Sequence, residues 1–162
     1  MVLALGAADA ACGSSAPRPA RLRVLVTRLP KDTVSFEAPA VASRCGRPGL
    51  DLLLQGSAGG NGVLIWLRPG DSLASGEFSL LPRADSTTPR GATVAVRFMV
   101  GEAAHGLTLD SGAVAVTLTE ASLSANARGS GLDHLAGGRA GVDASFESVP
   151  LETDTVACQV RL

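Results

Sequence analysis

Residues 113–127 read AVAVTLTEASLSANA, and this stretch decides the fold class. Apolar side chains recur there at every second position, on both sides of a one-residue slip in phase, at Val114, Val116, Leu118, Ala121, Leu123 and Ala125. A period of two is typical of a β-strand with one buried face, because successive side chains point to opposite sides of a strand. The slip between Leu118 and Ala121 indicates either a β-bulge or a bend.

The same pattern extends in both directions through segments separated by Gly, Pro, Asp and Ser. It predicts strands at residues 22–29, 33–37, 50–55, 63–68, 77–81, 92–100, 107–110, 113–127, 140–149 and 155–162. Pro39 is expected to stop the second strand, and the glycine-rich segments 56–62 and 128–141 are expected to be loops. We therefore expect an all-β chain with about nine or ten strands and little or no helix. The strand pattern predicts an antiparallel β-sandwich, with a closed or partly open β-barrel as the alternative.

Length and composition bound the possible functions. The 162 residues suit a single all-β domain over residues 21–162, preceded by a leader and tether at residues 1–20. The formal net charge of −1 gives no field that would attract nucleic acid. Aromatic residues make up 3% of the chain and tyrosine is absent, which argues against a surface for stacking bases or sugars. We expect no nucleic-acid partner.

The N-terminal residues resemble an export signal. Val2–Ala8 is apolar, and Ala8–Ala10 has the small-x-small form of a signal-peptidase site. The following Cys12 stands where a bacterial lipoprotein is lipidated, and Gly13–Pro17 would form a flexible tether. The sequence thus predicts an extracytoplasmic protein, either periplasmic or held at the membrane through a lipid on Cys12. A plain disordered leader is the alternative.

The remaining cysteines, Cys45 and Cys158, are candidates for a disulfide. Their bridge would close a loop of 113 residues (158 − 45), a constraint of about 4–5 kcal/mol in the chain-entropy description. The pairing depends on export to an oxidising compartment. Two unpaired buried thiols are the alternative. No Cys-x-x-Cys is present, so no metal site is expected.

One short motif suggests chemistry. Gly70-Asp71-Ser72-Leu73, followed by Gly76, resembles the nucleophile block of the GDSL esterases and lipases, which would make Ser72 the nucleophile. Such a serine needs a base and oxyanion donors. Neither histidine follows an aspartate at the family's Asp-x-x-His spacing, and neither asparagine stands in the family's Gly-x-Asn-Asp block. Pro69–Ser72 reads equally well as a turn. We expect no enzyme, with a GDSL-like serine esterase as an alternative.

Two further features bear on function. Asp133 and His134, inside the glycine-rich segment, are the candidate ligand contacts. Trp66, in an apolar segment, is expected in the core. No dinucleotide or phosphate motif is present, so no cofactor is expected.

The sequence favours a non-enzymatic exported or lipid-anchored β-domain with a binding or structural role in the cell envelope. Its partner would be an envelope protein or a small ligand. The alternative from another class is a lipid- or small-molecule-binding β-barrel.

Overall fold

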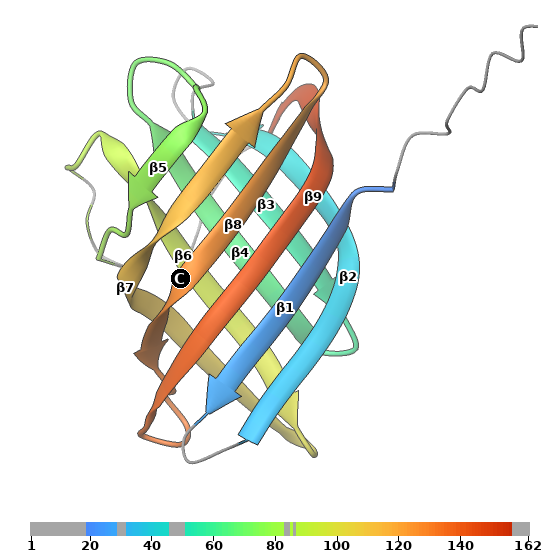
Figure 1. Ribbon diagram of the computed structural model, residues 1–162, viewed down its shortest axis with the longest axis vertical. Helices are drawn as coiled ribbons and strands as arrows, with labels where there is room; N and C mark the ends of the chain where they lie inside the picture. Colours follow the sequence, from blue (N-terminus) through green and yellow to red (C-terminus); the bar gives the residue numbers. More distant parts are fainter. Residues whose placement is uncertain (1–18, 29–31, 46–50, 83–84, 86, 157–162) are drawn as a thin grey trace, which may run out of the picture.

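The computed structural model describes residues 19–28, 32–45, 51–82, 85 and 87–156, with backbone alone at residues 45, 152–154 and 156. This part of the chain forms nine β-strands and contains no helix (Figure 1). The strands are β1 (Arg21–Arg28), β2 (Asp32–Cys45), β3 (Asp51–Ala58), β4 (Asn61–Pro69), β5 (Gly76–Ser79), β6 (Arg90–Val100), β7 (Ala103–Leu118), β8 (Ser122–Leu132) and β9 (Arg139–Val156).

Eight of the strands close into an up-and-down barrel, in which each strand pairs antiparallel with the next along the chain. Closure comes from β1, which pairs antiparallel with both β2 and β9, so that Val24 lies between Phe36 and Ala144. The short β5 pairs with β7 and bridges to β6 at Leu80 and Ala92, where those two strands diverge. The all-β class is therefore confirmed in its barrel form, and the sandwich is not, because one closed sheet replaces two stacked ones.

Side chains fill the barrel interior. Alternate residues point inward on each strand, as with Leu22, Val24 and Val26 of β1. The bulkiest fully buried side chains are Phe78, Phe98, Phe146, Leu22, Leu52, Leu54, Ile65, Leu67, Leu109, Leu123, Val26 and Val94. Eight strands enclose a space just wide enough for such side chains to meet at the axis. The interior of the described barrel is a packed core.

Strand β2 continues through Pro39, so the expectation that this proline would end the strand is wrong. The N–H of the next residue, Ala40, donates to Ala20 on the β1 side. Successive backbone N–H groups point to opposite sides of a strand, so the nitrogen of Pro39 faces the β3 side. There the ladder between β2 and β3 begins one residue later, at Ala40 and Gly56. The missing N–H of the proline therefore removes no ladder hydrogen bond.

The phase slip after Leu118 is a turn between strands. The N–H of Thr119 donates to the carbonyl of Ser122, and the chain reverses from β7 into β8 at that point. The predicted strand 113–127 is thus the end of one strand and the start of the next. Each half keeps its own inward set of apolar residues, which explains why the phase changes at the turn.

Much of the glycine-rich segment 128–141 is strand, not loop. β8 runs on to Leu132, and Gly129 and Gly131 lie within it, where β7 approaches closely. A Cβ on Gly129 would lie 2.0 Å from the carbonyl oxygen of Ser111, and one on Gly112 would lie 2.0 Å from that of Arg128. Glycine is the residue that permits such an approach. These glycines accommodate a bend in β7. Before the bend β7 pairs with β6, and after it β7 pairs with β5 and β8.

Replacing Gly112 by alanine should strongly destabilise the barrel. Gly112 has φ +113° in addition to the backbone contact, so the methyl group adds both strain and overlap, at least about 3 kcal/mol together. Gly101 is the matched control, because it has φ +59° with open space around it and G101A should cost about 1 kcal/mol. Urea unfolding of both variants measures the difference. Equal losses would show that the β7–β8 contact does not constrain the bend.

Candidate functional site

A large hollow lies on the outer wall of the barrel, over β2, β3, β4 and β6. Its volume is about 550 Å³. One row of outward side chains crosses it through directly paired positions, from Val41 to Gln55, then Leu64, then Ala95. Leu64 and Ala95 are half-buried, whereas Val41 is 42% exposed. We call this hollow the outer groove; most of its surface is apolar.

A second row, two positions along each strand, supplies small residues and one charge. Ser57 pairs with Gly62, Gly62 with Arg97, and Arg97 with Gly106. Arg97 thus stands between two glycines on the neighbouring strands, with no side chain on either side to cover it. Gly62 also lines the outer groove.

Arg97 is exceptional among the arginines that the structure describes, because its side chain has no hydrogen bond, ion pair or ring contact. The other described arginines are engaged: Arg21 and Arg23 with Glu37, Arg28 with Asp32, Arg68 with Asp85, Arg128 with Asp143, Arg139 with Asp110, Arg90 over the ring of Phe78, and Arg44 as well. An exposed guanidinium between two glycines, beside apolar side chains, is available to an anionic group from outside.

Another outer face, over β1, β2 and β9, carries charged side chains that form ion pairs within the protein. Arg23 pairs with Glu37 at 3.2 Å and with Glu147 at 3.2 Å. A hollow of about 490 Å³ on this face is lined by Arg23, Glu37 and Asp143 around Leu25, which is 46% exposed. Each of these described charges already has a partner, so none of them is free for a ligand.

Trp66 lies on the outer wall and is half-buried, so its expected place in the core is wrong. Its indole N–H donates to Asp51 at 3.1 Å, and the guanidinium of Arg68 stacks over the ring at 4.7 Å. Arg68 in turn donates to the carbonyl oxygen of Thr88 in the β5–β6 connection. The β5–β6 connection therefore covers this part of the outer wall. Of the outward residues of β4, Trp66 and Arg68 lie beside this connection and Leu64 lies in the outer groove.

A buried His–Asp pair closes one end of the barrel. His105 Nδ1 lies 2.8 Å from Asp133 Oδ2, and its ring stacks on Phe98 with centroids 5.3 Å apart. Asp133 is 1% exposed and also accepts the N–H groups of Leu135 and Ala136. Burial alone would raise the pKa of Asp133, but the hydrogen bonds from Ala136, His105 and Leu135 outweigh burial and lower it. The pair links the β8–β9 turn to the interior face of β7.

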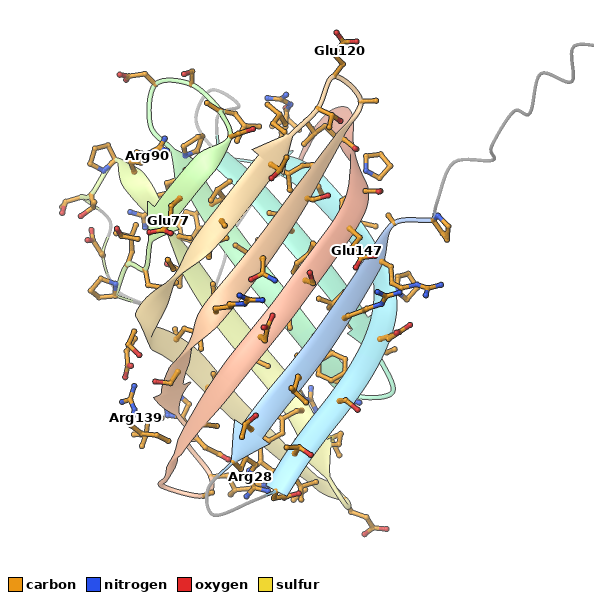
Figure 2. All side chains as sticks on the ribbon, viewed as in Figure 1. Arg28, Glu77, Arg90, Glu120, Arg139 and Glu147 are labelled. Carbon is orange, nitrogen blue, oxygen red and sulfur yellow. The ribbon has the colours of Figure 1, made fainter. Side chains whose placement is uncertain are left out.

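The structure separates the two candidate ligand contacts. Asp133 uses both carboxylate oxygens within the protein, and Arg28 Nε lies 3.7 Å from one of them. The side chain of His134 is exposed, and the backbone N–H of this residue donates to the carbonyl of Gly106. Figure 2 shows Arg28 and Arg139 at this same end of the barrel. A small hollow of about 100 Å³ remains between them.

The GDSL-like motif lies at the other end of the barrel. Ser72 is exposed after Pro69, which pairs with Arg90 at the start of β6, whereas His105 pairs with Phe98 near the end of that strand. Arg90 and Phe98 are eight positions apart along β6 (98 − 90), which corresponds to roughly 26 Å in an extended strand. His134 lies at the same end as His105. Neither histidine can act as a base for Ser72 in this arrangement.

The cysteines fall at the limit of the described residues. Cys12 and Cys158 lie outside them, so lipidation and the bridge stay predictions. The backbone of Cys45, the last residue of β2, pairs in parallel register with Val156, the last residue of β9. Cys158 follows two residues later in the sequence. The chain therefore brings the end of β9 beside Cys45.

Wider comparisons add no functional assignment. Searches against protein families, curated proteins and solved structures found no match. Within the described ranges, no group of three or more His, Cys, Asp or Glu side chains is arranged to hold a metal ion. A helix long and apolar enough to span a membrane is likewise not found among the described residues.

Sequence reasoning missed the outer groove and the His105–Asp133 pair. A signal for the groove was present, since Arg97 is the single charged residue in the apolar segment 92–100. A charge in such a segment marks its outward face. The position of Arg97 between two glycines depends on how β4 and β7 pair with β6. This register cannot be read from a local sequence pattern.

Replacing Asp133 by asparagine should lower the free energy of unfolding by about 1–3 kcal/mol at neutral pH, because His105 loses a charged hydrogen-bond partner. Since the pKa of Asp133 is lower in the folded than in the unfolded chain, its ionised form stabilises the fold above about pH 4. That contribution disappears as the pH falls through the folded pKa. The gap between wild type and D133N, measured by urea unfolding, should therefore shrink below pH 4. A constant gap would contradict an ionised Asp133.

Cys45 and Cys158 should resist alkylation until a reductant is added, if the full chain is produced with its leader in a bacterium. The bridge would join the ends of β2 and β9, and C45A/C158A should lose about 4–5 kcal/mol of stability. Mass spectrometry of alkylated peptides before and after reduction measures the pairing. Both thiols alkylated without reductant would contradict the bridge and the oxidising location on which it depends.

Proposed function

We propose that this chain is a non-enzymatic, exported binding barrel that takes up a small apolar ligand in the outer groove. The single observation that carries the proposal is the location of free space in the described barrel. Phe78, Phe98 and Phe146 fill the interior, whereas about 550 Å³ of largely apolar hollow lies outside on four strands. That volume is within the range of about 300–1,000 Å³ that is typical of small-molecule sites.

The closed barrel favours this mode of binding over two others. Its eight strands leave no free edge along the main ladder, which argues against a partner that adds a strand. A carrier that encloses its ligand needs an empty interior, and here fully buried side chains such as Ile65 and Leu67 fill it. Binding through outward side chains is the mode that both facts support.

The cell-envelope location is part of the proposal. It is supported by the leader, by the cysteine that follows it at position 12, and by the backbone pairing of Cys45 with Val156 just before Cys158. In this setting the barrel would present the outer groove outside the cytoplasm, either free or held at the membrane by a lipid on Cys12.

A neutral dye that brightens in apolar surroundings, such as Nile red, should bind the wild-type protein and lose binding in V41D. Val41 is 42% exposed at the groove, so an aspartate there places a charge in the apolar site without disturbing the core. L25D is the matched control, because Leu25 is 46% exposed on the ionic face. Fluorescence titration measures both. Equal dye binding by V41D and wild type would refute the outer groove as the site.

A further inference from the structure

The geometry of the outer groove points to a more specific ligand, and this inference rests on the proposed function. We infer that the groove binds a single-chain fatty acid, with its carboxylate at Arg97 and its hydrocarbon chain over Ala95, Leu64 and Val41. Three properties of the described groove favour this ligand: an unpaired cation at one side, a row of three apolar residues and Gln55 that leads away from it, and a length that suits one chain.

The charge is the first argument. Arg97 has no partner in the described structure, and none of the described residues that line the groove is acidic. A guanidinium recognises a carboxylate through two parallel N–H···O hydrogen bonds, which are stronger than hydrogen bonds between neutral groups. The directly paired neighbours, Gly62 and Gly106, have no side chain that could compete for the guanidinium, and Arg97 lines the groove. A cationic or neutral head group would leave this guanidinium without a counter-charge.

The apolar row is the second argument. Ala95, Leu64, Gln55 and Val41 are consecutive paired positions on β6, β4, β3 and β2. Neighbouring strands lie about 4.8 Å apart, so the row extends roughly 14 Å across the wall. An unbranched hydrocarbon chain lying along this row would cover the side chains of Leu64 and Val41, which are otherwise partly in water. Burial of that apolar surface supplies the affinity that a single exposed ion pair lacks.

The scale of the groove is the third argument. A stable protein–protein interface buries more than about 1,000 Å² and needs a broad surface. The groove is a hollow of about 550 Å³, and Ser57 and Pro39 are among the residues that line it. Its dimensions match one chain with one head group.

Competition against bound Nile red tests the inference, with decanoate and decanol as ligands below the concentrations at which they aggregate. Decanoate should displace the dye from the wild-type protein more effectively than decanol does. R97Q should lower the affinity for decanoate by about five- to tenfold and leave the affinity for decanol unchanged. R128Q is the matched control, because Arg128 is an exposed arginine on β8, outside the outer groove, and is paired with Asp143. R97Q should unfold at the same urea concentration as wild type, since Arg97 has no partner to lose.

The outcomes separate this inference from the proposed function. Suppose that V41D abolishes dye binding but R97Q weakens the binding of decanoate and of decanol equally. The outer groove is then the binding site, and the fatty acid assignment is wrong. Failure of decanoate to displace the groove-bound dye also overturns the assignment. If the dye binds V41D as well as wild type, the proposed function itself fails. An equal loss of decanoate affinity in R128Q would show a non-specific charge effect and would overturn the role of Arg97.

Discussion

The pairing of β1 with β9 is the constraint on which the rest of the structure depends. It joins the first described strand to the last and closes an antiparallel sheet into a barrel of eight strands. Closure removes the open edges of the sheet and fixes the interior width at a size that Phe, Leu, Ile and Val side chains fill. Because the eight strands of the barrel are paired in a closed ring and its interior is filled, the outer wall is the surface left for recognition. On that wall, an ionic face over β1 and β9 contrasts with the outer groove over β3 and β4.

Most of the fold could be predicted from the sequence, because strand pattern is local. The alternation along Ala113–Ala127 contained both the strands and the turn between them, although its phase slip did not distinguish a bulge from a turn. The strands on either side of Pro39 and of Gly129 were harder to delimit. Whether a proline or a glycine ends a strand depends on what the neighbouring strand places opposite it, as the ladder beside Pro39 and the contact of Gly129 with Ser111 show. Barrel and sandwich differ in the pairing of the chain ends, which no local pattern encodes.

The candidate site was far less predictable. Asp133 stood out in the sequence, but its partner His105 lies 28 residues away and meets it only through the barrel. The turn chemistry around Ser72 imitates a catalytic motif, and register places that serine at the end of the barrel opposite to both histidines. Arg97 was visible as one charge in an apolar strand. Its isolation depends on Gly62 and Gly106, which flank it only after two separate strands have paired with β6.

The most direct test of a filled barrel that binds on its outside is methyl NMR during titration with decanoate. If the ligand binds in the outer groove, the methyl resonances of Val41 and Leu64, which point outward, should shift with added ligand. Those of Leu54 and Ile65, which are fully buried in the interior, should stay in place. Shifts concentrated in Leu54 and Ile65 would mean that the ligand enters the barrel. That result would contradict the central claim.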